Sequence, residues 1–386
     1  MTNNKDKKVL NVPNLRFPEF TGEWKKERLD EIAELSKGVG ISKEQLSSNG
    51  NPCILYGELY TKYKSEIISE VISKTNIEKN NLKHSKQNDV IIPCSGETAV
   101  DIAVARCVPF DNILLGGDLN IIRLHKYDGA FMAYQLNSKR KIEIAKLAQG
   151  VSVVHLYGEN LKSINTYNPS LQEQQKIVRL LSLLDERIKV QNKIIEDLKK
   201  LKSAISLNLL HSDSWMQFKI KDIATIGRGR VISSIEISQQ KNPLYPVYSS
   251  QTTNEGIMGY LDDFMFEGEY ISWTTDGANA GTVFYRNGKF NCTNVCGLIK
   301  LKKGFDTYCV SLILSEATRK YVSVNLANPK LMNNTMGEIQ IHLPKLEEQK
   351  RITIVFRKLQ ELFEVHNNLL TRYSKQKQYL LSQMFI

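Results

Sequence analysis

Few residues in this 386-residue chain are spaced as catalytic or cofactor-binding motifs require. The chain contains no phosphate loop of the form GxxxxGK followed by serine or threonine, so the sequence predicts no nucleotide-hydrolysing site. Amino-methyltransferases carry Asn or Asp, two prolines and an aromatic residue; the nearest match is NPLY at 242–245, without a preceding glycine-rich loop. We interpret this stretch as a turn that leads into a strand.

The cysteines do not form a metal-binding pattern. No CxxC pair or histidine-rich cluster is present, so a zinc site is not expected. The one close pair is embedded in asparagine, threonine and valine, which indicates small buried thiols in a strand or loop. The six cysteines are Cys53, Cys94, Cys107, Cys292, Cys296 and Cys309. We therefore predict no metal and no cofactor on this chain.

Binding chemistry is better supported than catalysis. Lysine and arginine total 52 against 41 aspartate and glutamate, a formal charge of +11, which favours a polyanionic partner such as nucleic acid. An anionic membrane surface would also attract this charge. No apolar run reaches the roughly 18 residues of a spanning helix, and MTNNKDKK at the start lacks the apolar stretch of a signal peptide. We expect a cytoplasmic protein with reduced thiols and no membrane contact.

The elements that would position a binding site are two copies of one helix. Large apolar residues recur in steps of four and three, as in a coiled coil, and the same seam returns 175 residues later. Across 169–210 and 344–385, 11 of 42 aligned residues are identical. The first seam comprises Ile177, Leu181, Leu184, Ile188, Gln191, Ile195, Leu198, Lys202, Ile205 and Leu209, and the second Ile352, Phe356, Leu359, Phe363, His366, Leu370, Tyr373, Lys377, Leu380 and Met384. The polar members either fix the register or contact another subunit.

The duplication extends to the region before each helix. WKKERLDEIAELSKG from Trp24 and WMQFKIKDIATIGRG from Trp215 align at an offset of 191. Each is followed by short β-rich runs separated by turn residues, which is typical of a compact mixed domain. The expected strands are 89–93, 102–108 and 119–124, then 245–248, 269–273, 281–285 and 295–301. We predict a leader at 1–20, globular domains at 21–168 and 212–343, and helices at 169–211 and 344–386.

Chain connectivity predicts how these parts are joined. A compact domain tends to keep its termini close together, so the second helix should return along the first as an antiparallel pair. The expected fold class is α+β, with two mixed globular domains separated by a coiled coil of roughly 60 Å and related by a pseudo-twofold internal repeat. Dimeric readers of duplex DNA bind two half-sites in this way. One chain with two divergent domains would read a bipartite, asymmetric site.

At this point the chain resembles the specificity subunit of a type I restriction-modification enzyme. The resemblance covers nearly the whole chain and is carried by PSLQEQQKI at 169, PKLEEQKRI at 344, YPVYSSQTTNEGIMGY at 245–260 and the leader VPNLRFPEFTGEW. It implies a non-catalytic subunit whose two target recognition domains bind double-stranded DNA. It also implies two modification subunits that carry S-adenosylmethionine, and restriction subunits that use ATP and Mg²⁺; none of these cofactors would be bound by this chain.

The candidate DNA contacts are donors and acceptors on predicted loops, because bases are read by forked donors, amides and carboxylates while lysine and arginine bind phosphate. For any one of them, a solvated turn residue is at least as good an interpretation. We rank Arg228 and Arg230, around Gly229, first. The full set is Lys37, Lys62, Ser95, Glu97, Thr98, Arg228, Arg230, Ser250, Gln251, Thr252, Thr275, Asn279 and Lys330.

Two other functional classes remain open at the level of sequence. In the first, the coiled coil is a scaffold that holds two protein-binding domains, and the positive charge is incidental. The basic loops near the start of both domains count against it. In the second, the chain is itself a nuclease or methyltransferase, which requires a catalytic constellation that the sequence lacks.

Overall fold

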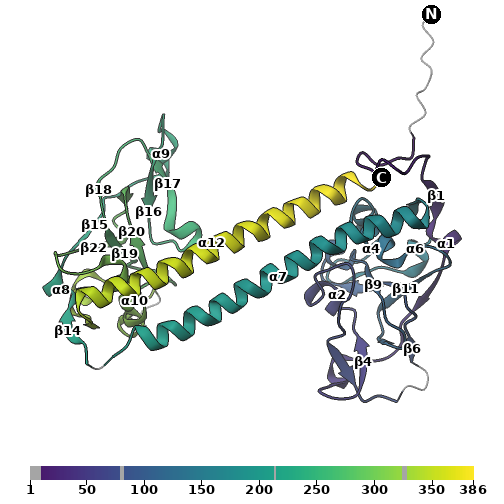
Figure 1. Cartoon of the computed structure of the whole chain (residues 1–386), viewed down its shortest axis with the longest axis horizontal. Helices are drawn as coiled ribbons and strands as arrows, with labels where there is room; N and C mark the ends of the chain where they lie inside the picture. Colours follow the sequence, from purple (N-terminus) through teal and green to yellow (C-terminus); the bar gives the residue numbers. More distant parts are fainter. Residues whose placement is uncertain (1–9, 79–81, 213, 324–327) are drawn as a thin grey trace, which may run out of the picture. The chain divides into compact units, whose positions relative to one another are not determined.

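The structure is a computed structural model that describes residues 10–78, 82–212, 214–323 and 328–386 (Figure 1). It divides into two compact units. Unit 1 comprises Met1–Lys193 and Asn367–Ile386, and unit 2 comprises Ile194–His366. Each unit therefore contains a globular region together with the start of one long helix and the end of the other.

The globular region of unit 1 is built from short strands and helices that precede the first long helix. The strands are β1 (Lys25–Arg28), β2 (Ala33–Lys37), β3 (Leu46–Ser47), β4 (Asn51–Ile54), β5 (Ser73–Thr75), β6 (Lys83–His84), β7 (Asp89–Pro93), β8 (Ser95–Gly96), β9 (Arg106–Val108), β10 (Leu114–Leu115), β11 (Leu119–Leu124), β12 (Val154–His155) and β13 (Asn165–Asn168). The helices are α1 (Leu29–Ile32), η1 (Lys43–Gln45), α2 (Glu58–Thr61), α3 (Ala99–Ile102), α4 (Gly129–Asn137), α5 (Lys141–Lys146), α6 (Gly158–Leu161) and α7 (Leu171–Leu209), which continues into unit 2.

Unit 2 has a comparable set of elements. Its strands are β14 (Met216–Lys219), β15 (Ala224–Arg228), β16 (Tyr245–Tyr248), β17 (Ile257–Leu261), β18 (Phe266–Glu267), β19 (Tyr270–Thr274), β20 (Val283–Arg286), β21 (Lys289–Cys292), β22 (Cys296–Leu301) and β23 (Gln340–Leu343). Its helices are α8 (Ile220–Ile223), α9 (Ser234–Ser238), η2 (Thr253–Gly256), α10 (Thr307–Ala317), η3 (Thr318–Tyr321), α11 (Asn333–Glu338) and α12 (Leu346–Gln383), which continues into unit 1.

The central sheet has the same topology in both units. Its order is β2-β11-β7-β9 in unit 1 and β15-β22-β19-β20 in unit 2, and all neighbouring strands pair antiparallel. In both units the strand before the sheet pairs with the strand before the long helix, β1 with β13 and β14 with β23. A helix that packs on the sheet, α4 or α10, contributes to the main apolar core. The expected internal repeat and the α+β class are confirmed.

The repeated glutamine at the start of each long helix has a structural role. Gln174 Nε2 donates to the carbonyl of Pro169 at 2.9 Å, and its Oε1 accepts from the N–H of Asp128 at 2.9 Å. In unit 2, Gln349 makes the equivalent bonds: its Nε2 donates to the carbonyl of Pro344 at 2.8 Å, and its Oε1 accepts from the N–H of Asp306 at 2.9 Å. Asp128 is the N-cap of α4, so this amide joins the start of the long helix to the start of the sheet-packing helix. The repeated Pro-x-Leu-x-Glu-Gln sequence thus encodes a junction between helices.

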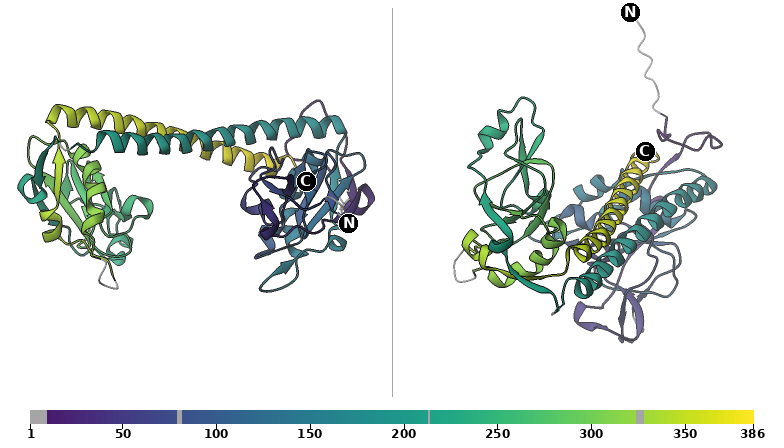
Figure 2. Two further views of the ribbon diagram at one scale, coloured as in Figure 1. Left: turned by 90° about the horizontal axis from the view of Figure 1, so that it is seen from below. Right: turned by 60° about the vertical axis from the view of Figure 1, so that its left-hand side comes forward.

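The two long helices run antiparallel within unit 1, and parts of them lie side by side (Figure 2). Lys377 Nζ contacts Asp185, whereas Arg187, two residues further along α7, lies over the ring of Tyr373, four residues earlier on α12. The numbers rise along one helix as they fall along the other. In unit 2, residues near the end of α7 share an apolar core with Ile352 on the first turns of α12. Within each unit, the segments of α7 and α12 that it contains are therefore antiparallel, as predicted.

The predicted seam is buried or half-buried at most positions. Ile177, Leu181 and Leu184 are at most 4% exposed, as are Ile352 and Phe356. The half-buried members are Ile188, Gln191, Leu198, Phe363, His366 and Tyr373, while Leu359 is buried.

The seam prediction is wrong at the end of α7. Leu209 is 38% exposed, whereas Leu210 is 3% exposed and belongs to the apolar core of unit 2. The helix ends at Leu209, and Leu210, whose N–H still donates to the carbonyl of Ser206 at 3.0 Å, takes the inward position. Lys202 is also exposed.

The polar seam residue Lys377 is explained by an ion-pair cluster. Its ammonium contacts both Glu66 and Asp185, and all three side chains are at most 12% exposed. Asp185 also accepts from the hydroxyls of Tyr134 at 2.6 Å and Ser65 at 3.0 Å. Burial raises the pKa of Tyr134, and the negative charge of Asp185 adds to that effect. Lys377 therefore fixes the end of α12 against α7 and the globular region of unit 1.

Three remaining expectations concern membrane spans, one strand and the cysteines. No helix in the described part of the chain is long and apolar enough to cross a membrane. The run at 102–108 is strand only from Arg106, because Ile102 ends α3. All six cysteines are buried and free, which includes the pair Cys292 and Cys296 that was predicted to be buried.

Candidate nucleic-acid interface

Each unit places a basic residue followed by glycine at the end of the first strand of its central sheet. Lys37 ends β2 and Arg228 ends β15. A Cβ on Gly38 would lie 2.0 Å from the carbonyl oxygen of Gly116, and a Cβ on Gly229 would lie 1.5 Å from that of Cys292, the last residue of β21. Only glycine fits so close an approach. The repeated pair therefore fixes the point at which each basic side chain leaves the sheet.

The two arginines around Gly229 differ in how they are held. Arg228 donates through Nε to Asn333 Oδ1 at 2.8 Å, and its NH2 lies 3.6 Å from the sulfur of Met332. The guanidinium of Arg230 forms a forked ion pair with Glu236, with NH1 2.9 Å from Oε2. This hydrogen-bonded pair raises the pKa of Arg230 and lowers the pKa of Glu236. Arg228 keeps donors available for a ligand, whereas a ligand at Arg230 must compete with a carboxylate.

The loops after β16 and β19 meet at a shared carbonyl. Ser250 and Thr275 both donate their hydroxyls to the carbonyl oxygen of Val295, with a distance of 2.8 Å for Thr275. Ser250 also donates to Asp276 Oδ1 at 3.1 Å. Thr275 is only 2% exposed, so its hydroxyl joins loops inside the protein. The prediction that Thr275 contacts DNA is therefore corrected to a positioning role.

The neighbouring candidates of unit 2 lie on the same group of loops. Asn279 is exposed and donates through Nδ2 to Thr252 Oγ1 at 3.1 Å, while the amide of Gln251 donates to a backbone carbonyl. The backbone of Lys330 bridges to that of Asp276, the residue that Ser250 contacts. Asn333, which holds Arg228, follows three residues later. The structure thus brings together Arg228, Ser250, Thr252, Thr275, Asn279 and Lys330.

Unit 1 has a smaller cluster around the end of β2. Lys37 Nζ lies 3.1 Å from Asp118 Oδ1, and the hydroxyl of Ser95 donates to Asp118 Oδ2 at 3.3 Å. The hydrogen bond to Asp118 raises the pKa of Lys37. Ser95 is 5% exposed, so it orients Asp118 and is not positioned as a direct contact, contrary to expectation. Glu97, two residues later, is exposed.

The last two candidates of unit 1 serve the local fold. Thr98 is the N-cap of α3 and accepts from the N–H of Asp101 at 3.1 Å. Lys62 pairs at 2.7 Å with Glu58, whose carboxylate is buried. An unpaired buried carboxylate is costly, so the ion pair with Glu58 is enough to account for a lysine at position 62, without a DNA contact.

Sequence reasoning missed three residues of these clusters. Asp118 has a positive φ of 58° after two glycines, and Asp276 supports Ser250. The hydroxyl of Tyr60 lies close to Gly96, and burial raises the pKa of Tyr60. The GGD turn was the available signal for Asp118. Nothing in the local sequence distinguishes Tyr60 from a core tyrosine.

The combined chemistry is that of recognition. Arginine can donate to guanine or phosphate, exposed amides can pair with adenine, and a carboxylate can accept from the amino group of cytosine. Among the described residues, no group of three or more His, Cys, Asp or Glu could hold a metal ion.

Comparison with protein families gives an independent result. The family model described as type I restriction modification DNA specificity domain matches residues 21–200 and again 212–372. These two matches correspond to the two copies of the repeat and together cover most of the chain.

Individual relatives agree with the family match. A putative type I specificity subunit N-terminus from Mycoplasma pneumoniae is 43% identical over 143 residues, 36% of this chain and 74% of that protein. The specificity subunit of the M. pneumoniae type I restriction enzyme MpnII is 46% identical over 137 residues, 35% of this chain, but the match spans only 41% of that relative. The crystal structure of a type I restriction-modification S subunit from M. genitalium has a TM-score of 0.70 at 18% identity, covering 97% of this chain and 99% of that one. At this low sequence identity, the similarity to the M. genitalium structure shows a shared fold.

Proposed function

Since the chain belongs to the type I restriction-modification DNA specificity family, we propose that each of its units reads one half of a bipartite, asymmetric site in double-stranded DNA. The observation that carries this proposal is that the two units share one frame but differ in the loops beside it. The frame is the same in both units, from the central sheet to the basic-glycine pair and the glutamine junction. The loops beside that pair differ in residue type and in contacts. Two different sets of donors on one frame suit two different half-sites.

The subunit itself is non-catalytic in this proposal. Two modification subunits, which carry S-adenosylmethionine, dock on the long helices and methylate adenine. Restriction subunits that use ATP and Mg²⁺ complete the assembly. Support comes from the name of the MpnII relative, which is the specificity subunit of a type I restriction enzyme. The sequence contributes the lack of a phosphate loop and of a methyltransferase motif.

The experiment is co-expression of the chain with the methyltransferase encoded beside it, followed by mapping of methylated adenines across the host genome. We expect one split motif that is methylated only when this chain is present. A stable complex without any sequence-dependent methylation or DNA binding would favour a scaffold instead. Purified chain that methylates or cuts DNA alone would contradict the non-catalytic role.

The helices have a second role in this proposal, as the determinant of spacing between the half-sites. One inserted heptad adds roughly 10 Å to a helix. Inserting a heptad at matched places in α7 and α12 should lengthen the unread spacer by about three base pairs at 3.4 Å each. Both half-sites should stay the same. A changed half-site would mean that the helices read bases.

A further inference from the structure

Arg16 is one of several residues that hold the leader of the chain against unit 1, together with Asn14 and Leu15, which bind Gln383. Arg16 forms a forked ion pair with Glu173 on the first turn of α7, with both nitrogen–oxygen distances at 2.7 Å. The indole N–H of Trp24 donates to the same carboxylate at 3.2 Å, and Arg16 NH1 donates to the carbonyl of Gly22. Glu173 and Trp24 are each 1% exposed. The carboxylate at the start of α7 thus accepts hydrogen bonds from both an arginine of the leader and the indole of a tryptophan.

Unit 2 repeats the receiving residues without the segment that fills them. Trp215 aligns with Trp24 at the offset of 191, and Glu348 aligns with Glu173 at the offset of 175. The chain reaches Trp215 from the end of α7 at Leu209, so no leader precedes it. Glu348 is exposed, and its carboxylate has no hydrogen bond or ion pair within the described ranges of the chain.

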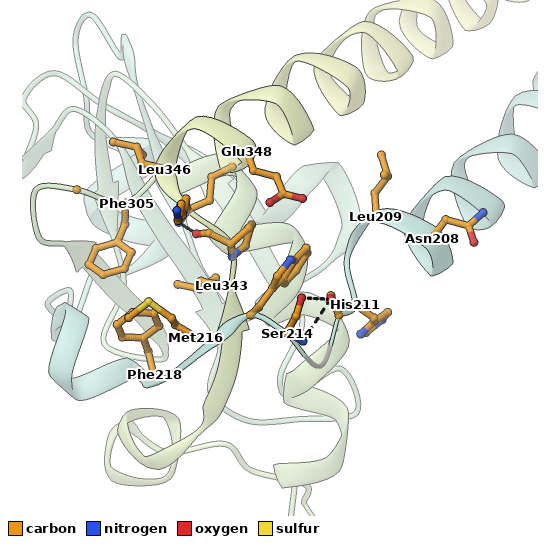
Figure 3. Close-up of a pocket in the computed structure, with 16 residues that line it drawn as sticks. Asn208, Leu209, His211, Ser214, Met216, Phe218, Phe305, Leu343, Leu346 and Glu348 are labelled. Atoms are coloured by element: carbon orange, nitrogen blue, oxygen red, sulfur yellow. Dashed lines mark hydrogen bonds between the residues drawn. The ribbon is translucent and has the colours of Figure 1, made fainter.

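A cavity of about 740 Å³ occupies this place in unit 2. Its wall includes Trp215, Glu348 and His211, with apolar surface from Phe218 and Phe305. In Figure 3 the carboxylate of Glu348 faces the open space between the start of α12 and the end of α7. The cavity therefore combines an unpaired carboxylate with an aromatic wall, which suits a guanidinium and the apolar residues beside it.

We propose that this cavity is a docking site for a polypeptide segment of another protein, which pairs an arginine with Glu348 beside Trp215. The occupant follows from charge complementarity and from the internal precedent: the repeat builds the receptor twice, and the copy in unit 1 holds an arginine. A second copy of this chain is the less suitable source, because its own Arg16 is already paired with a buried carboxylate.

The test uses the full chain and a synthetic peptide with the sequence of residues 10–22, LNVPNLRFPEFTG, labelled for fluorescence anisotropy. We expect saturable binding at one site. Replacing the peptide arginine by alanine should weaken binding about tenfold or more, because forked hydrogen bonds between charged groups are lost. Glu348→Gln in the chain should have the same effect, since it removes the charge and keeps the shape.

The matched control is Glu347→Gln, which removes an exposed carboxylate from the same helical turn outside the cavity. It should change the affinity by less than about twofold. Equal binding of the arginine and alanine peptides, or unchanged binding to the Glu348→Gln chain, would overturn the proposal. Concentration-dependent dimerisation of the wild-type chain that Glu348→Gln abolishes would also overturn it, in favour of a second copy as the occupant.

Discussion

Replacement of Arg228 by alanine is the sharpest perturbation of the candidate interface. Only its Nε is used in a hydrogen bond to oxygen within the described part of unit 2, so the rest of the fork can face a phosphate or a guanine. Loss of charge-assisted hydrogen bonds of this kind costs about 1.5 kcal/mol or more, roughly a tenfold loss of affinity. If the contact is to a phosphate, the slope of log affinity against log salt should fall in magnitude by about 0.9.

Arg230→Ala should have the smaller effect. In the protein its fork is already bound to Glu236, so DNA binding exchanges one ion pair for another. Exposed ion pairs contribute about 1 kcal/mol at most, and we expect a loss of affinity of roughly threefold or less.

The assay is fluorescence anisotropy of a duplex carrying the recognised site, bound by the complex with the modification subunits, from about 50 to about 200 mM salt. The charge control is Lys303→Ala, an exposed lysine beyond the opposite end of the β15–β22 pair. If Arg228→Ala and Lys303→Ala give the same affinity and the same salt slope, Arg228 does not contact DNA. A larger effect at Arg230 than at Arg228 would contradict the ranking drawn from their partners.

Three further predictions concern the frame and are read out as free energies of unfolding in urea. Lys377→Met should destabilise the chain by about 3 kcal/mol, because it leaves two nearly buried carboxylates, Glu66 and Asp185, without their shared cation. Gln174→Leu should cost about 2–3 kcal/mol, because it leaves the carbonyl of Pro169 before α7 and the N–H of Asp128 before α4 unpaired. Gly229→Ala should cost at least about 2 kcal/mol, since its Cβ would lie 1.5 Å from a backbone oxygen.

Each of these substitutions has a neighbouring control. Lys375→Met and Gln175→Leu change exposed residues on the same helices and should stay within about 0.5 kcal/mol of wild type. Gly227→Ala adds a Cβ that meets no atom within 4 Å and should cost far less than the change two residues later. A Lys377, Gln174 or Gly229 variant that unfolds at the same urea concentration as its control would contradict the corresponding role.

The repeated frame could be predicted from the sequence because it depends on periodic and local signals. The four-three spacing locates α7 and α12 to within a few residues, and the β-rich runs locate the central strands. The seam prediction failed at Leu209 because the spacing alone does not show that, at the last residue of α7, the neighbouring Leu210 packs into the core of unit 2 instead. The glutamine junction was visible as a repeated motif, but its bond to Asp128 joins residues 46 positions apart.

The loops could be predicted less well, since residue type alone does not distinguish a hydroxyl that faces solvent from one that joins two loops. Ser95 and Thr275 have the composition of contact residues, yet both are buried against neighbouring loops. Arg230 has the residue type of a phosphate-binding side chain, but in the structure its guanidinium is paired with Glu236. These distinctions depend on contacts between segments that lie far apart in sequence, which one sequence does not encode in a readable pattern.

The central claim is that the two units read separate halves of one DNA site. Its most direct test is genome-wide mapping of adenine methylation in a host that expresses the methyltransferase with either this chain or a version whose residues 212–343 come from another member of the family. One half of the methylated motif should change, and the half read by unit 1 should remain with the same sequence. A motif that changes in both halves, or in neither, would contradict the claim.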